Sequence, residues 1–160
     1  VEEDDYVEMF TNLLQKACDK REQKIHPSFS SIITQLSHAD AKLLKIISDN
    51  HTIPIIELEE RHSDGSLTPY YGYYTKEYSY GDLDTHVYSP YEMMISIENL
   101  RRLQLVLLNS HIISTKEQYE DVRKTPYYKS ITSGPNHLSE RRYRVELTRL
   151  GARFVSVCLP

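Results

Sequence analysis

The 160-residue chain has no tryptophan, three phenylalanines, five glycines and two cysteines. Cys18 and Cys158 are far apart and outside any C-x-x-C pair, so neither a disulfide framework nor a cysteine-based zinc site is expected. No apolar run approaches the roughly 18 residues of a membrane span, and no signal peptide is recognisable. We therefore expect a cytoplasmic protein without membrane contact, long enough to bury a core without disulfides.

Catalytic motifs that can be recognised from local spacing are also missing. The sequence has no glycine-rich phosphate loop, no G-x-S-x-G and no H-E-x-x-H. Its net charge of −4 argues against a general nucleic-acid coat but leaves room for one basic patch. We assign no catalytic residue, no metal and no cofactor, and favour a protein that is not an enzyme.

Tyrosine is the residue in excess. There are thirteen, and seven of them fall between Tyr70 and Tyr88, inside a segment (62–89) that shows no sustained periodicity. This segment predicts an irregular insertion or a loose hairpin. Tyr70, Tyr71, Tyr73 and Tyr74 are candidate partner-binding residues, because tyrosine offers a large amphipathic surface at low entropic cost. The simpler alternative is a hairpin whose tyrosines cover the core.

The stretch from Ser89 to Leu108 is the clearest helix. Ser89 and Glu92 form a capping-box pattern, and Pro90 suits the first helical position. Met93, Ile97 and Leu100 then share one face, which Leu107 and Leu108 extend, while Glu98, Asn99, Arg102 and Val106 point the other way. We expect one face to pack and the other to meet solvent or a partner.

Other elements follow from periodicity and capping signals. A helix is predicted over 5–18, where apolar residues recur from Tyr6 to Cys18 with the spacing of one amphipathic face, and others over 27–36 and 41–49. Ser37 with Asp40 forms a capping-box-like start for the helix over 41–49, and Thr148 caps a last helix. Pro54 restricts the strand over 52–59 to an edge or a strand start. Strands are also predicted over 111–115 and 142–147, the latter with Tyr143, Val145 and Leu147 on one face. The segment 116–131 is ambiguous.

This order of elements predicts an α+β fold that is mainly helical, with a winged helix-turn-helix-like core, a small antiparallel sheet and extra N-terminal helices. We expect a single domain over 1–160, in which 1–36 is an N-terminal helical part and 37–160 is the core with its tyrosine-rich insertion at 62–89. The chain starts without methionine in helical sequence, which suggests a fragment of a longer protein.

In such a fold the helix over 90–108 takes the recognition position and the pair of strands forms the wing. Asn99 and Arg102 on the helix, with Arg141, Arg142 and Arg144 on the wing, are therefore candidates for binding nucleic acid or a partner. An ion pair between Glu98 and Arg102, four residues apart, is the simpler account of the helix face.

A metal site would need carboxylates and histidines in register. Asp82, Asp84 and His86 alternate, and Glu57, Glu59 and His62 repeat the idea less well. Neither set has a recognised spacing, so solvated loop charges explain them more simply. His26 precedes Pro27 and is expected to bond locally at a helix start.

Four ordered blocks carry a family resemblance: EMFTNLL, HPSFSSIITQLSHADAKLLK, ENLRRLQLV and LTRLGARFVSVC. Together, from Met9 to Cys158, they resemble the bacterial abortive infection alpha family. The resemblance implies a bacterial protein associated with defence against phage, in a family of unknown biochemical activity with no established catalytic residues. Gln104 stands where the family pattern usually has glycine, and the tyrosine-rich segment is particular to this chain.

The leading hypothesis is thus a non-catalytic interaction domain of a phage-defence protein, acting through protein or nucleic-acid contacts. A protein partner or self-association is expected, and nucleic acid is an open alternative. Two other hypotheses stay open: a metal-dependent nuclease or other toxic effector, and a homo-oligomeric structural module.

Overall fold

The computed structural model describes residues 2–18, 25–76, 89–111, 114–134 and 137–159. The chain divides into two compact units that are interleaved in sequence. Unit 1 contains 1–51, 96–107 and 146–160, and unit 2 contains 52–95 and 108–145. Among the described residues, no helix is both long and apolar enough to cross a membrane.

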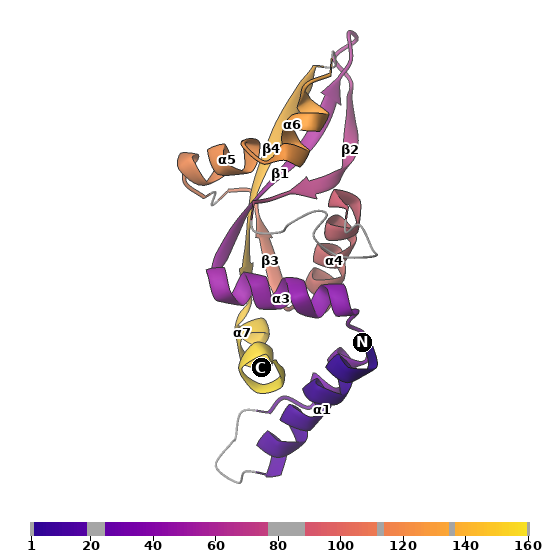
Figure 1. Cartoon of the computed structure of the whole chain (residues 1–160), viewed down its shortest axis with the longest axis vertical. Helices are drawn as coiled ribbons and strands as arrows, with labels where there is room; N and C mark the ends of the chain where they lie inside the picture. Colours follow the sequence, from indigo (N-terminus) through magenta and orange to yellow (C-terminus); the bar gives the residue numbers. More distant parts are fainter. Residues whose placement is uncertain (1, 19–24, 77–88, 112–113, 135–136, 160) are drawn as a thin grey trace. The chain divides into compact units, whose positions relative to one another are not determined.

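Unit 1 is helical. It holds α1 (Glu2–Cys18), α2 (Phe29–Ile33), α3 (His38–Asn50), α7 (Arg149–Cys158) and the C-terminal half of α4 (Pro90–Arg102). Figure 1 shows α1 beside the C-terminal α7, which it contacts. The core closes around Phe29 and Phe154, which are fully buried and meet edge to face at 5.3 Å.

The predicted helix starts are confirmed by their hydrogen bonds. Ser89 and Glu92 form the capping box of α4, with the Ser89 N–H donating to Glu92 at 2.7 Å and the Glu92 N–H donating to Ser89 Oγ at 3.2 Å. Ser37 and Asp40 form the same reciprocal pair at α3. The Thr148 hydroxyl accepts the Gly151 N–H at the start of α7.

The end of α4 differs from the prediction, because the helix stops at Arg102 rather than Leu108. Gln104 has a positive φ of 60°. The Gln104 N–H donates to the Arg101 carbonyl and the Leu105 N–H to the Leu100 carbonyl, both at 2.9 Å. This is a Schellman motif, in which a left-handed residue ends the helix. The chain continues into β3 (Val106–Asn109).

Unit 2 contains most of the sheet together with two short helices. Its elements are β1 (Thr52–Arg61), β2 (Leu67–Tyr74), α5 (Lys116–Arg123), α6 (Pro126–Thr132) and most of β4 (Leu138–Leu147). The four strands follow the order β2-β1-β4-β3, and β1 pairs antiparallel with β2. Tyr70, Tyr71, Tyr73 and Tyr74 therefore lie on a strand of a hairpin. A hairpin was one of the two alternatives predicted for this segment, the other being an irregular insertion.

An α+β fold is confirmed, whereas the winged-helix core is not. β1 lies between β2 and β4, so the edge position suggested by Pro54 is wrong. Pro54 instead stands near the strand start, before the pairing with β2 begins at Ile56. Of the expected wing strand over 111–115, the described residues His111, Ser114 and Thr115 are not in a strand, and 112–113 lie outside the described residues. The single-domain organisation with boundaries 1–36 and 37–160 stays a prediction.

The core of unit 2 lies between one face of the hairpin and the two short helices. Ile56 and Leu58 of β1 pack with Tyr119 and Val122 of α5 and with Tyr128 of α6. These side chains project from alternate strand positions, so one face of β1 meets α5 and α6. On β4, the side chains of Arg141 and Arg142 are exposed, and each lies next to a carboxylate.

Candidate interaction surfaces

Arg141 and Arg142 are neighbours on β4 and therefore project to opposite faces of the sheet. Arg141 Nε lies 2.8 Å from Glu59 Oε1, and the Glu59 side chain is only 10% exposed. On the other face, Arg142 Nε lies 3.3 Å from Glu140, and its guanidinium lies 5.7 Å from the centre of the Tyr119 ring. Strand alternation places Arg144 on the same face as Arg142, whereas Arg141 projects to the opposite face.

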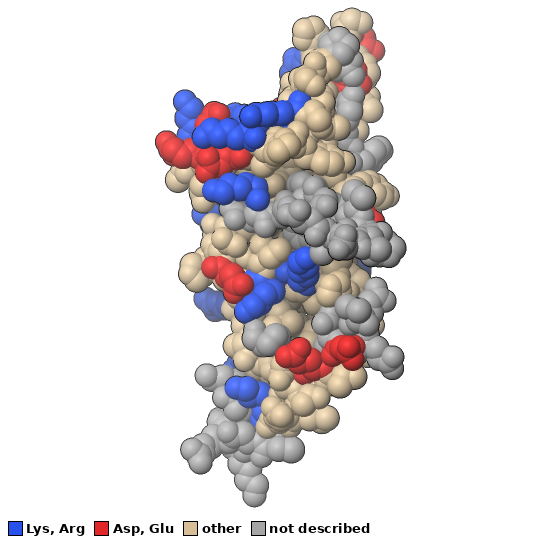
Figure 2. All heavy atoms as spheres, viewed as in Figure 1, with Lys and Arg blue, Asp and Glu red and all other residues tan. Residues whose placement is uncertain are grey.

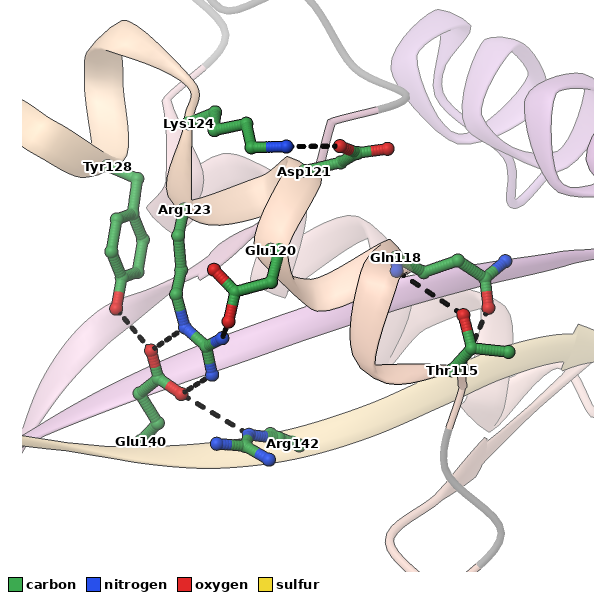
Figure 3. A network of polar contacts seen from close by, with 9 residues as sticks. All are labelled: Thr115, Gln118, Glu120, Asp121, Arg123, Lys124, Tyr128, Glu140 and Arg142. Carbon is green, nitrogen blue, oxygen red and sulfur yellow. Dashed lines mark hydrogen bonds and ion pairs between the residues drawn. The ribbon is translucent and has the colours of Figure 1, made fainter.

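Glu140 is the centre of a polar network that links β4 to both short helices (Figure 3). Arg123 of α5 donates Nε to Glu140 Oε1 at 2.7 Å and Nη2 to Oε2 at 2.5 Å, a bidentate pair. The Tyr128 hydroxyl of α6 donates to Oε1 at 2.5 Å. The hydrogen bonds from Arg123 lower the pKa of Glu140 to about 2, so the carboxylate is held in its charged form.

Asp121 of α5 pairs with two lysines that lie close to this helix. Asp121 lies 3.1 Å from Lys76 Nζ and 3.3 Å from Lys124 Nζ, and its pKa is lowered chiefly by the hydrogen bond from Lys76. On the face drawn in Figure 2, basic and acidic side chains lie next to one another at α5. This arrangement offers no unopposed positive patch to a phosphate backbone.

Asn99 and Arg102 of α4 are engaged within unit 1. Asn99 Nδ2 donates to the Gln35 carbonyl at 3.0 Å and to Asp40 Oδ2 at 2.8 Å. Arg102 donates to Asn99 Oδ1 from Nε and Nη2, and to Gln35 Oε1 from Nη1 at 3.0 Å. The expected pair with Glu98 is wrong, because Arg102 turns toward Asn99 and Gln35 instead.

These bonds tie the C-terminal turn of α4 to the connection between α2 and α3. Asp40 is 4% exposed and also accepts the Ser37 N–H at 2.9 Å, so its carboxylate receives donors from two elements. A buried carboxylate is costly unless it is paired in this way. Asn99 therefore links α4 to α3 and to the residues before it. The periodicity of the α4 sequence alone did not predict this structural role.

All four candidate tyrosines belong to β2, and two of them are core residues. Tyr73 and Tyr74 are buried, at 6% and 4% exposure. Tyr73 lies 6.1 Å from the ring of Tyr143, and Tyr74 meets Tyr128 edge to face at 5.9 Å. Tyr70 and Tyr71 belong to β2, and their side chains lie outside the described part of the chain.

The carboxylates considered for a metal have other partners. Glu57 accepts the Tyr143 hydroxyl at 2.9 Å, Glu59 pairs with Arg141, and His62 Nε2 lies 2.7 Å from the Thr68 hydroxyl. Within the described ranges no three His, Cys, Asp or Glu side chains are grouped to hold an ion. Asp82, Asp84 and His86 lie outside those ranges.

His26 bonds locally, as expected for a residue at a helix start. The Ser28 N–H donates to His26 Nδ1 at 3.2 Å, and the same nitrogen lies 2.7 Å from Ser28 Oγ. Its ring also tilts against Phe29 at 6.1 Å. The imidazole thereby helps to shape the turn that leads into α2.

A shallow groove of about 140 Å³ lies between α1 and α3 in unit 1. Its floor is apolar, and its rim carries charges of both signs; the lining residues are Glu8, Met9, His38, Ala41, Lys42, Lys45 and Leu159. The mixed rim selects no particular ligand charge.

An exposed apolar stripe on α1 is the feature that sequence reasoning missed. The sequence predicted one apolar face from Tyr6 to Cys18, whereas the helix has two. Met9 and Leu13 are buried, at 3% and 8% exposure, while Val7 and Leu14 are 59% and 64% exposed. Phe10 lies between Val7 and Leu14 on the helix surface and is partly exposed. We call Val7, Phe10 and Leu14 the α1 stripe.

Comparison with known proteins identifies a family and a similar solved structure. A family model described as abortive infection alpha matches residues 1–158. Among solved structures, the chain is similar to an uncharacterized protein from the hydrocarbon-degrading marine bacterium Alcanivorax borkumensis SK2. The identity is 16% over 87% of this chain and 96% of that chain, with a TM-score of 0.48. No curated protein matches the chain.

Proposed function

Because the chain belongs to the abortive infection alpha family, we propose that it serves phage defence as a non-catalytic interaction domain acting in the cytoplasm through protein contacts. The observation that carries this proposal is the α1 stripe. Two large aliphatic side chains, Val7 and Leu14, are more than half exposed on one line of a helix whose other face is already buried. Aligned apolar side chains of this kind are typical of a helix that meets another protein.

The electrostatics favour a protein over a nucleic acid as the partner. Arg141 faces Glu59, while Arg142 and Arg123 face Glu140. Nucleic-acid binding depends on basic side chains whose charge is available to phosphates. In this proposal the arginines of β4 hold the sheet and α5 together, and the winged-helix-like order of elements serves as a scaffold.

Phage challenge of cells that express the full protein tests the role of the stripe. Leu14→Lys places a charge in the stripe, whereas Gln15→Lys places the same charge on the next residue, which is also exposed. We expect Leu14→Lys to abolish protection, measured as plaque counts, and Gln15→Lys to retain it. Equal protection by the two variants, at equal protein levels, would remove the stripe from the proposal.

Mobility shifts over a salt series test the nucleic-acid alternative. We expect no shift at low salt with single- or double-stranded DNA or RNA. A shift that weakens steeply with salt and is reduced by Arg144→Ala would instead support phosphate contacts on β4. Either result is independent of the plaque counts.

A further inference from the structure

The α1 stripe has the spacing of a helix that packs against another helix. Val7, Phe10 and Leu14 stand at i, i+3 and i+7, which places them on a single seam along about two turns. Met9 and Leu13 occupy the opposite side and are buried, and α1 contacts α2 and α7 within unit 1. The stripe is therefore a second packing face of a helix that is already held in place.

We propose that the α1 stripe binds the α1 stripe of a second copy of the chain, with the two helices antiparallel. This inference rests on the proposed function and names the partner. Its first support is self-complementary shape: Val7 and Leu14 are of similar size and lie symmetrically about Phe10 and Thr11. A two-fold axis near Phe10 would place Val7 against Leu14 of the second copy, and the reverse, as an isologous contact requires.

The charge along the segment supports the antiparallel orientation. Residues 2–8 contain five acidic residues and no basic one, whereas the rest of α1, residues 9–18, contains Lys16 and no acidic residue. Parallel helices would set two acidic ends against each other. Antiparallel helices place the acidic first turns of one copy near the last turn of the other copy, which carries Lys16, and antiparallel helix dipoles attract each other.

The expected affinity is modest. A helix of 17 residues is about 25 Å long, and a single pair of helices buries less than the roughly 800 Å² per partner of a standard stable interface. Self-association should therefore depend on concentration in the micromolar range, and salt should weaken it by screening the end charges.

Sedimentation velocity of the full chain, from low micromolar to several hundred micromolar, tests the proposal. The wild type and Gln15→Lys should move from monomer mass to dimer mass over this range. Leu14→Lys should shift the dissociation constant at least about tenfold, which is about 1.4 kcal/mol. Circular dichroism checks that each variant is folded. We expect both to fold, because the side chains of Leu14 and Gln15 are exposed.

Cross-linking between single cysteines tests the orientation, in a Cys18→Ser background. Thr11→Cys, near the two-fold axis, should form a disulfide-linked dimer by itself. Val7→Cys should do so only when mixed with Leu14→Cys. Efficient linkage of Val7→Cys to itself would overturn the antiparallel arrangement.

Failure of this inference can be told apart from failure of the proposed function. If the wild type is monomeric throughout, or if Leu14→Lys dimerises as the wild type does, the second copy is excluded as the occupant of the stripe. A monomeric wild type whose protection is still lost in Leu14→Lys would overturn the self-pairing and leave the interaction role of the stripe standing.

Discussion

The backbone of Gly151, in the first turn of α7, lies directly against the carbonyl group of Leu105. A Cβ built on residue 151 would lie 1.9 Å from the Leu105 oxygen and 2.8 Å from its carbonyl carbon. The same oxygen accepts the Thr148 N–H at 3.0 Å, so the carbonyl cannot move away without losing that bond. Only glycine allows the helix start and the end of the α4 turn to approach this closely.

Gly151→Ala should therefore destabilise the protein, although alanine is the better helix former. At an open helical position this change would stabilise by about 0.5–1 kcal/mol. Here the overlap should lower the free energy of unfolding by about 1–3 kcal/mol or more, measured by urea denaturation. The matched control is Ala152→Gly at the next, exposed position, where a loss of about 1 kcal/mol is expected. A stabilised Gly151→Ala protein would show that the contact is relaxed at little cost.

Gln104→Gly should stabilise the protein. Gln104 has a φ of 60°, a left-handed conformation that costs a residue with a Cβ about 1–2 kcal/mol and glycine almost nothing. Glycine has more conformational entropy in the unfolded chain, and this reduces the gain. The free energy of unfolding should still rise by about 0.5–1 kcal/mol. Thermal denaturation measures it as a rise in Tm, and Gln104→Ala, which keeps a Cβ, should show no such rise.

The sequence predicted the helices that carry their own start signals. Ser37 with Asp40, Ser89 with Glu92, and Thr148 all cap where expected, because a capping box is a local hydrogen-bonding pattern. The same logic could have found α5, since Thr115 and Gln118 form a capping box (Figure 3). The end of α4 also had a local signal, in the glycine that the family pattern usually has at position 104.

The candidate site was less predictable, because the relevant partners are distant in sequence. Asn99 bonds to Asp40 across 59 positions and Arg141 to Glu59 across 82, so neither pair leaves a periodic trace. Periodicity on α1 failed for another reason. A helix with two apolar faces looks like one broad face when only the sequence is read.

Asn99 should matter to folding rather than to recognition. Asn99→Asp is nearly isosteric but places a second carboxylate where Nδ2 now lies 2.8 Å from Asp40 Oδ2. Loss of the donor and repulsion between the carboxylates should together lower the free energy of unfolding by about 1–3 kcal/mol. Urea denaturation measures this loss. The control is Glu98→Gln on the exposed neighbour, for which we expect a change within about 0.5 kcal/mol. A fully stable Asn99→Asp protein would contradict a structural role for Asn99.

Glu140 should make stability depend on pH in the acid range. Its pKa in the folded chain is about 2, below the ordinary value of 4.5, so the unfolded chain takes up the proton first as pH falls. The stabilisation is complete above about pH 5 and is lost progressively as pH falls toward 2. A difference of this size corresponds to about 3 kcal/mol.

Urea denaturation of the wild type and Glu140→Gln at about pH 7 and about pH 3 tests this expectation. Glutamine cannot form the charged pair with Arg123, so the variant should be less stable near neutrality by about 2 kcal/mol or more. It should also lose less stability than the wild type between the two pH values, because it has no carboxylate to protonate at position 140. Glu117→Gln, on the exposed first turn of α5, is the matched control and should keep the wild-type difference. An equal acid sensitivity of wild type and Glu140→Gln would mean that Glu140 is not the carboxylate that binds α5 and α6 to β4 in a pH-dependent way.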